Sequence, residues 1–205
     1  AYRKWAGKCD ACGGWNTIVE EAPLSTGPKA LGAKGRTIPL SDLATEEAPP
    51  PRASSGIDEL DRVLGGGLVP ASAILVGGDP GIGKSTLLLQ ATASFARKGL
   101  KCLYISGEEA SAQVRMRAQR LGLTDAAVQP GAESNRRDIL STLGAERPAL
   151  AIIDSIQTMH SDQIEGAPGT VSQVRGCAFE LIRYAKESGV ALVLVGHVTK
   201  DGSIA

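Results

Sequence analysis

Gly78-Asp79-Pro80-Gly81-Ile82-Gly83-Lys84-Ser85 is the stretch that decides the fold, because it fits the pattern G-x-x-x-x-G-K-[ST]. An apolar run at 72–76 comes before it, and a helical pattern at 83–97 begins within it. Glycines let backbone N–H groups turn toward phosphate oxygens, and the helix N-terminus adds the positive end of its dipole. A merely structural turn would need neither the lysine nor the hydroxyl. The stretch therefore predicts a phosphate-binding loop between a strand and a helix.

The expected ligand of this loop is ATP or ADP with Mg²⁺. Lys84 should reach the β- and γ-phosphates and contribute to catalysis, the Ser85 hydroxyl should ligate Mg²⁺, and Thr86 should line the α-phosphate side. The predicted nucleotide-binding residues are Gly78, Asp79, Pro80, Gly81, Ile82, Gly83, Lys84, Ser85 and Thr86.

Strand and helix patterns alternate outward from the loop. Short apolar runs predict further strands at 102–106, 150–153 and 191–195. Apolar residues at helical spacing predict helices around 114–121, 139–143 and 171–185. Such alternation is typical of a parallel sheet with helices on both faces, whose ligands bind at the carboxyl ends of the strands. The predicted fold class is therefore α/β, with a mostly parallel β-sheet flanked by helices.

Carboxylates follow two of the predicted strands. Asp154 ends the apolar run at 149–153, where it is expected to hold the magnesium shell. In Ser106-Gly107-Glu108-Glu109, Glu108 is the preferred catalytic base that deprotonates the water attacking the γ-phosphate. Glu109 has the alternative interpretation of an acid favoured at a helix start by the dipole. The sequence leaves open which of the two is the base.

Gly196-His197-Val198-Thr199-Lys200 ends the last predicted strand with three polar side chains. Because the carboxyl ends of parallel strands meet at one edge of the sheet, His197 and Thr199 are expected to sense the γ-phosphate. A histidine satisfied by its own loop is nearly as good an explanation for His197 taken by itself.

The segment from His160 to Arg175 is typical of a loop, because it contains Gly166, Pro168 and Gly169. Such a loop can face a ligand in the middle of a ring. Its polar candidates for that contact are Gln163, Thr170, Gln173 and Arg175. A merely solvated loop is the alternative, because the segment carries little positive charge.

The N-terminal part of the chain differs in composition. Residues 1–21 place Cys9 and Cys12 at C-x-x-C spacing, which supplies one half of a four-ligand zinc site, so zinc is not expected here. Residues 22–53 are rich in Pro, Ala, Ser, Gly and Glu and predict a linker. A short helix after Ser55 then opens the main domain, predicted at 54–205.

The charge balance excludes a whole-molecule attraction to nucleic acid or membranes. Lys+Arg and Asp+Glu both number 22 among 205 residues, so the net charge is zero and any DNA contact must be local. No apolar run is long enough to span a bilayer, and the first residues show no signal-peptide pattern. We therefore expect a cytoplasmic location and no membrane partner.

Taken together, the motifs resemble one family closely. They are W-x-G-K-C-x-x-C-x-x-W-N-T at 5–17, S-G-I-D-E-L-D-R-V-L-G-G-G-L at 55–68, the loop at 78–85, S-G-E-E and G-H-V-T-K. This combination is similar to the bacterial RadA (Sms) family of RecA-like DNA repair ATPases. The resemblance implies a RecA-like P-loop core that forms hexameric rings, binds single-stranded DNA and recombination intermediates, and drives branch migration in recombinational repair as a helicase-like motor. It also implies a possible recombinase partner, and Zn²⁺ in the full-length protein.

By the same resemblance, Lys84, Ser85 and Thr86 hold phosphates, Asp154 holds magnesium and Glu108 orients the attacking water. The residues that it places toward DNA are Gln163, Gln173, Arg175 and Lys200. Three family features are missing from the sequence: a first C-x-x-C, a K-N-R-F-G motif and a C-terminal Lon-protease-like domain. We therefore expect a partial zinc-finger segment and a C-terminally truncated core. Since the family builds its ATP site between subunits, such a portion is expected to bind nucleotide and hydrolyse it slowly.

Two other functions stay open at this point. A RecA-fold ATPase that acts on protein partners without binding DNA would suit the neutral charge, although the cysteine-tryptophan start argues against it. A nucleotide-gated repair scaffold would use its N-terminal arm to recruit another repair protein. Salt-dependent DNA binding would separate the DNA motor from the protein-directed ATPase.

Overall fold

The computed structural model of this chain describes Leu40, Asp42 and residues 51–197. The chain divides into two units, residues 1–47 and 48–205, and every helix and strand described below lies in the second. The predicted zinc-finger segment at 1–21 and most of the predicted linker at 22–53 lie outside the described residues. These domain boundaries stay predictions.

Strands and helices alternate along the described part of the chain. The strands are β1 (Ala73–Gly78), β2 (Cys102–Ser106), β3 (Val128–Ala132), β4 (Leu150–Asp154) and β5 (Ala191–His197). The helices are α1 (Asp58–Val63), α2 (Lys84–Arg97), α3 (Ser111–Arg120), α4 (Arg136–Glu146) and α5 (Val171–Ser188), with a short 3-10 helix, η1 (Ile156–Thr158), after β4.

The five strands form one parallel sheet in the order β1-β5-β4-β2-β3. Gly78 at the end of β1 is paired with His197 at the end of β5. Ser106 at the end of β2 is paired with Asp154 at the end of β4. The predicted phosphate loop, both predicted acids and the predicted sensor histidine therefore meet at one edge of the sheet, as expected for the carboxyl ends of parallel strands.

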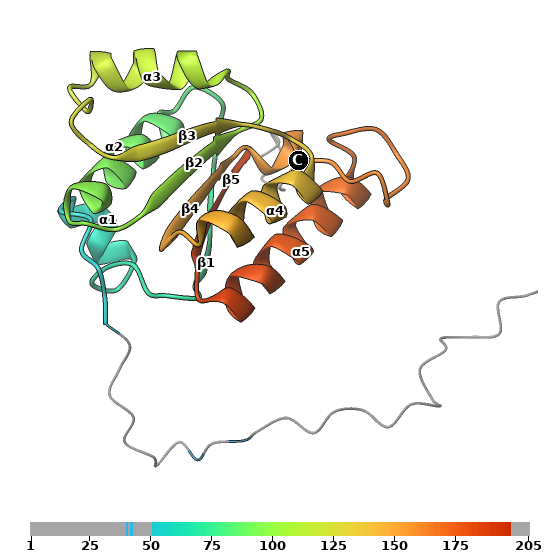
Figure 1. The fold of residues 1–205 in the computed structure, drawn as a ribbon, viewed down its shortest axis with the longest axis horizontal. Coiled ribbons are helices and arrows are strands. Elements are labelled where there is room, and N and C mark those ends of the chain that lie inside the picture. The colour runs from blue at the N-terminus through green and yellow to red at the C-terminus, as the bar shows by residue number, and fades with distance from the viewer. Residues whose placement is uncertain (1–39, 41, 43–50, 198–205) are drawn as a thin grey trace, which may run out of the picture. The chain divides into compact units, whose positions relative to one another are not determined.

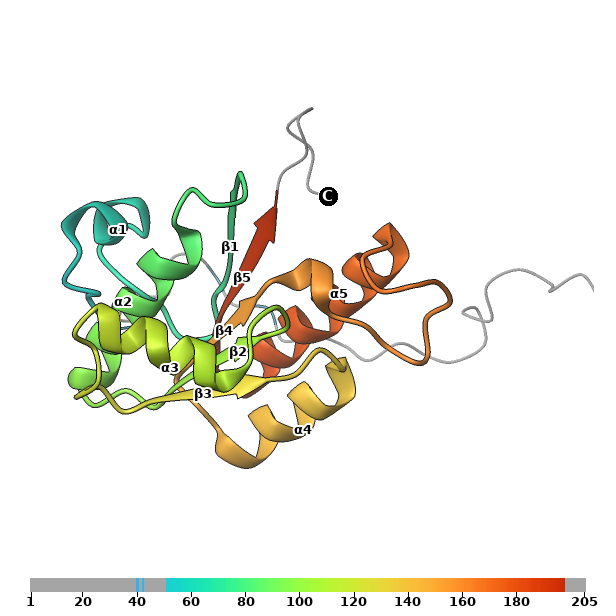
Figure 2. The same ribbon diagram turned by 90° about the horizontal axis from the view of Figure 1, so that it is seen from above.

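Helices cover both faces of this sheet (Figures 1 and 2). Helices α1, α2 and α3 pack on one face, where Leu88, Phe95 and Val114 join one apolar core. Helices α4 and α5 pack on the other face, where Ile139 and Leu181 join a second. Strands β2 and β4 are buried along their whole length, as strands covered on both faces must be. The predicted α/β class is confirmed, and the sheet is consistent with a P-loop RecA-like core.

Strand β3 is an element that the sequence patterns do not predict. Its residues, Val128–Ala132, include Pro130 and Gly131, which are typical of turns. Proline cannot donate a hydrogen bond to a neighbouring strand, so it is tolerated mainly at the edge of a sheet. In the described sheet β3 lies at that position, paired with β2 alone.

The segment before α1 is fastened to the helix by one carboxylate. Asp61 Oδ1 accepts a hydrogen bond from the Ser55 N–H (2.7 Å), and Oδ2 accepts from the Gly56 N–H (3.1 Å) and the Ser54 hydroxyl (2.7 Å). The Ser55 hydrogen bond is the largest cause that lowers the Asp61 pKa, to about 2 from an ordinary value of 3.8. Asp61 therefore ties the entry of the domain to α1.

Replacing Asp61 by alanine should lower the thermal midpoint of unfolding by about 2–4 °C, since three donors lose a charged acceptor that is partly screened by solvent. A lowered folded pKa stabilises the native state above the unfolded value, so this contribution should be complete above pH 3.8 and vanish as the pH falls toward about 2. Thermal melts across that range measure both effects. Asp58→Ala on the same helix is the matched control, and equal losses in the two variants would contradict the role of Asp61.

Candidate nucleotide-binding site

The loop between β1 and α2 is open and presents unpaired backbone donors. Residues 79–83 are exposed. Gly83 has a φ of +103°, which side-chain-bearing residues rarely adopt, and a Cβ built there would meet nothing within 4 Å. The first hydrogen bond of α2 runs from the Leu87 N–H to the Gly83 carbonyl, so the N–H groups of residues 84–86 have no partner within the helix. Unpaired donors at a helix N-terminus fit a phosphate group.

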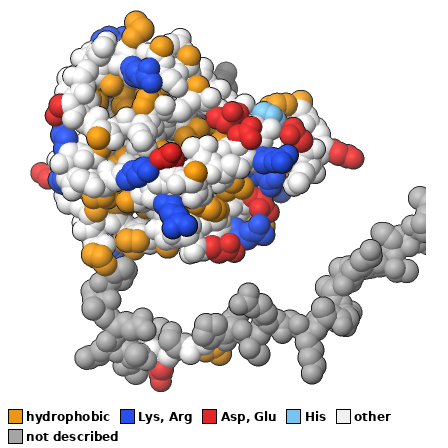
Figure 3. All heavy atoms as spheres, in the orientation of Figure 1, with side chains coloured by type: hydrophobic (Ala, Val, Ile, Leu, Met, Phe, Trp, Pro, Cys, Tyr) orange, Lys and Arg blue, Asp and Glu red, His pale blue; other side chains and the backbone are white. Residues whose placement is uncertain are grey.

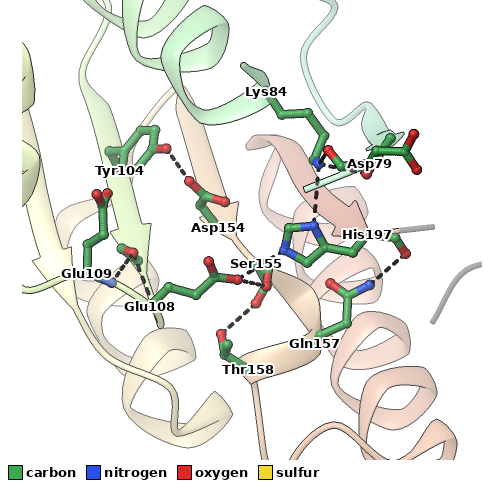
Figure 4. A network of polar contacts seen from close by, with 12 residues as sticks. Asp79, Lys84, Tyr104, Glu108, Glu109, Asp154, Ser155, Gln157, Thr158 and His197 are labelled. Carbon is green, nitrogen blue, oxygen red and sulfur yellow. Dashed lines mark hydrogen bonds and ion pairs between the residues drawn. The ribbon is translucent and has the colours of Figure 1, made fainter. Parts of the chain in front are cut away.

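The Lys84 side chain folds back over this loop. Its Nζ donates hydrogen bonds to the carbonyl oxygens of Gly78 (2.7 Å) and Asp79 (2.8 Å), and it lies 3.4 Å from His197 Nδ1 (Figure 4). The residue is buried, with 8% of its surface exposed. An ammonium group has only donors, so His197 Nδ1 must accept. The second ring nitrogen, Nε2, then carries the proton.

His197 connects the lysine to the predicted base. Its Nε2 lies 3.2 Å from Glu108 Oε1, and the same oxygen accepts a hydrogen bond from the Ser155 hydroxyl at 2.5 Å (Figure 4). The peptide bond between Asp154 and Ser155 is cis. One continuous chain of polar contacts therefore runs from Lys84 through His197 to Glu108.

The environment of Glu108 keeps its carboxylate ionised. Burial acts to raise its pKa, but the hydrogen bonds from Ser155 and His197, together with the positive charge of Lys84, outweigh burial and lower the pKa below the ordinary value of 4.5. The side chain is 45% exposed. A general base must be deprotonated and within reach of water, and Glu108 meets both conditions.

The Ser106–Glu109 turn is held in place from two sides. The Ser106 hydroxyl accepts hydrogen bonds from the N–H groups of Glu108 (3.2 Å) and Glu109 (2.9 Å). Gly107 lies so close to η1 that a Cβ there would come within 2.1 Å of Thr158 Oγ1. Glu109 points away from His197 and forms an ion pair with Arg117 at 2.7 Å. The turn thus directs Glu108 toward the loop and Glu109 toward α3.

Asp154 and Ser85 meet at the hydroxyl of Tyr104. Asp154 is buried, with 4% of its surface exposed, and Oδ2 accepts a hydrogen bond from that hydroxyl. The same hydroxyl lies 3.5 Å from the Ser85 carbonyl oxygen. Hydroxyl and carboxylate oxygens are the protein ligands that Mg²⁺ takes. The Tyr104 hydroxyl thus links β4 to the backbone at the start of α2, and magnesium binding by the Ser85 hydroxyl and the Asp154 carboxylate stays a prediction.

The structure corrects the prediction for Gln173. This residue is 2% exposed, and its amide donates to the carbonyls of Ser161, Ile164 and Gly166 while accepting from the Ser161 N–H. Its polar atoms are committed to the chain before α5, so Gln173 holds the loop and does not face a ligand. The physical reason is that a loop needs internal partners for its backbone groups.

Other polar candidates of the loop are accessible. Gln163 and Arg175 are exposed, and the Gln163 side-chain oxygen accepts a hydrogen bond from Arg136 at 3.2 Å. The Thr170 hydroxyl donates to the Ala167 carbonyl at 2.9 Å. A DNA contact for Gln163 or Arg175 stays a prediction.

Several predicted residues lie outside the described part of the chain. These are Cys9, Cys12, Thr199 and Lys200. Among the described residues, no group of three or more His, Cys, Asp or Glu side chains is arranged to hold a metal ion. Nor does any helix there have the length and apolar character needed to cross a membrane.

Two contributors to the site were missed by sequence reasoning. Tyr104 lies in an apolar run and is typical of a core residue, and Arg117 lies on an amphipathic helix, where a charged residue is typical of the solvated face. Nothing in the local pattern indicates that either one reaches the site. The sequence gives a weak indication that Ser155 belongs to the site, since it directly follows Asp154, the predicted magnesium ligand.

A parallel sheet with a phosphate loop after β1, a buried acid at the end of β4 and a predicted base at the same edge defines an ATPase core of the P-loop class. The chain belongs to the AAA domain family, whose model matches residues 47–203.

Relatives extend this similarity over the whole chain. It is 55% identical over 214 residues to "DNA repair protein RadA" of Brucella abortus, covering 100% of this chain and 46% of that protein. It is 47% identical over 209 residues to the protein of that name in Pseudomonas aeruginosa and 48% over 214 residues to that of Escherichia coli, with the same coverage. The resemblance predicted from the motifs is confirmed, and the chain spans about half the length of these curated relatives.

Proposed function

We propose that this chain is the ATP-hydrolysing portion of a cytoplasmic DNA repair protein that binds single-stranded DNA and promotes branch migration. The observation that carries the proposal is the contact chain from Lys84 through His197 to Glu108 at the carboxyl edge of the sheet. It joins a phosphate-binding lysine to a carboxylate that is ionised and exposed. The similarity to proteins named for DNA repair supplies the biological setting.

The proposed chemistry assigns one task to each side chain. Lys84 binds the β- and γ-phosphates, and Glu108 accepts the proton of the attacking water while Ser155 and His197 hold its carboxylate. Ser85 and Asp154 would hold Mg²⁺, which would supply positive charge beside the phosphate oxygens. Glu108 is preferred to Glu109 as the base, because Glu109 forms an ion pair with Arg117.

His197 is proposed to report on the γ-phosphate. Its Nδ1 accepts from Lys84, and its Nε2 donates to Glu108. When the Lys84 ammonium group binds a phosphate, His197 loses its contact with Lys84. The hydrogen bond from His197 to the Glu108 carboxylate then changes. Thr199 is proposed to assist, and its position lies outside the described residues.

The DNA function is proposed to involve the loop at 160–175 together with Lys200. Figure 3 shows acidic and basic side chains interspersed over the visible face, so a local contact is expected there and not a broad basic surface. A homo-hexameric ring that encloses recombination intermediates, a recombinase partner and a zinc element in the full-length protein complete the proposal.

The deciding experiment measures ATP turnover by the full-length protein with and without single-stranded DNA. We expect DNA to stimulate turnover, and Arg175→Glu to weaken DNA binding about tenfold while leaving DNA-free turnover intact, because a phosphate contact becomes a repulsion. Lys186→Glu reverses a charge at the other end of α5 and is the matched control. Turnover that ignores DNA would favour an ATPase directed at protein partners, and absence of nucleotide binding would overturn the proposal.

A further inference from the structure

Tyr104 is a buried polar side chain with no part in the chemistry described so far. It lies in the middle of β2, between β4 and β3, with 0% of its surface exposed. Since Ser106 is paired with Asp154, residues 104, 106 and 154 lie on the same face of the sheet. Tyr104 therefore approaches Asp154 from the adjacent strand, on the side where α2 begins.

The Tyr104 hydroxyl is the meeting point of three elements. It donates a hydrogen bond to Asp154 Oδ2 on β4 (Figure 4). It also lies 3.5 Å from the Ser85 carbonyl on α2. From α3, Arg117 Nη2 donates to the hydroxyl oxygen at 3.4 Å, and the guanidinium carbon lies 5.8 Å from the centre of the ring. The hydroxyl has one proton, which it donates in the hydrogen bond to Asp154.

Arg117 holds this arrangement from outside the sheet. Its side chain is 13% exposed, and its Nη2 also forms the ion pair with Glu109 at 2.7 Å. The contacts therefore continue from Asp154 through Tyr104 and Arg117 to the residue next to the proposed base. Because the guanidinium donates to the hydroxyl oxygen, the hydroxyl proton is free to be donated to Asp154.

The Tyr104 hydroxyl is the hydrogen-bond donor of the Asp154 carboxylate. A buried carboxylate must find hydrogen-bond donors, or its ionised form becomes unfavourable. Tyr104 supplies one donor to Oδ2, and among the described residues Oδ1 accepts no hydrogen bond.

We propose that Tyr104 is a positioning residue that fixes the Asp154 carboxylate so that one oxygen is held and the other is presented to the magnesium ion of the nucleotide site. The inference rests on the proposed function and goes beyond it, since it gives the site a specific dependence on one tyrosine hydroxyl. Phenylalanine would fill the same space within the core. The hydroxyl, and not the ring, carries the effect.

The test compares nucleotide binding and turnover in full-length Tyr104→Phe and wild-type proteins over a range of Mg²⁺ concentrations. We expect the Mg²⁺ concentration that gives half-maximal ADP binding, and the one that gives half-maximal ATP turnover, to rise about tenfold. This is the effect expected from the loss of one hydrogen bond to a charged group. ADP affinity measured in EDTA should be unchanged. In an Asp154→Asn background the same substitution should have no further effect, because Tyr104 acts through Asp154.

Tyr184→Phe is the matched control, since it removes the same hydroxyl from α5, on the opposite face of the sheet. Unchanged Mg²⁺ dependence in Tyr104→Phe would overturn the inference, and so would an equal loss of ADP affinity with and without Mg²⁺. Should Tyr104→Phe not fold, Arg117→Met gives a second reading, with an expected shift of about threefold in the same direction. No shift in that variant would overturn the inference as well.

The binding measurement separates this inference from the proposed function. If the wild-type protein binds no nucleotide, the proposed function fails and the inference fails with it. If the wild-type protein binds nucleotide with help from Mg²⁺ and Tyr104→Phe behaves in the same way, only the inference is lost.

Discussion

Lys84→Ala should reduce ATP turnover about a hundredfold or more. The ammonium group is the charge that would neutralise the β- and γ-phosphates, and removing one such stabilising group from an enclosed site typically costs two to three orders of magnitude in rate. The same ammonium group also donates hydrogen bonds to the Gly78 and Asp79 carbonyls of the loop. Release of inorganic phosphate at saturating ATP measures the rate, and a fluorescent ADP analogue measures binding.

Lys186→Ala provides the comparison for this prediction. Lys186 is exposed in the last turn of α5, so the same loss of charge occurs away from the site. We expect the control to keep wild-type turnover. A Lys84→Ala protein that hydrolyses ATP at the wild-type rate would show that hydrolysis does not occur at this loop.

Glu108→Gln is the second substitution with a large expected effect. The amide keeps the shape of the side chain and removes its ability to take a proton, so turnover should fall by about two to four orders of magnitude while nucleotide binding persists. Such a variant should bind ATP and retain it unhydrolysed. Single-turnover measurements with pre-bound ATP distinguish this result from a loss of binding.

Glu109→Gln is the natural partner experiment, because it makes the same chemical change one residue along the chain. Glu109 pairs with Arg117, so this variant is expected to keep most of its turnover. A large loss in Glu109→Gln with none in Glu108→Gln would exchange the two roles.

The pKa of Glu108 also fixes the pH behaviour of this base. Because the folded pKa is lowered, the carboxylate stays deprotonated from neutral pH down to its ordinary value of 4.5. Its contribution to stability is present above 4.5 and is lost as the pH falls through the lowered folded value. If turnover declines at a pH above 4.5, the titration of another group must therefore cause it.

Local motifs made much of the site predictable. The phosphate loop needs glycine, lysine and a hydroxyl at fixed spacing. Asp154 is the last residue of the apolar strand β4, and Glu108 lies two residues after the end of β2. Strands β1, β4 and β5 extend beyond their predicted ends, to Gly78, Asp154 and His197. This extension has a simple cause, since polar and glycine residues at a strand end still pair with their neighbours in the sheet.

Contacts between distant parts of the chain were not predictable. Tyr104 and Asp154 are 50 residues apart and meet because β2 and β4 are neighbours in a particular register. Lys84 and His197 are 113 residues apart and meet because β1 lies beside β5. Gln173 looks like any polar residue at a helix start until the carbonyls that it binds are placed around it. Sequence periodicity carries no information on which strands are neighbours.

The position of β1 also has a consequence for how this protein is made. Within the described sheet, the strand that leads into the phosphate loop pairs with β5 alone, and more than a hundred residues separate the two in the chain. Closing so long a loop is slow, and a chain emerging from the ribosome cannot close it until β5 has been synthesised. The strands between them can pair earlier, so within the described sheet β1 and the phosphate loop that follows it join last.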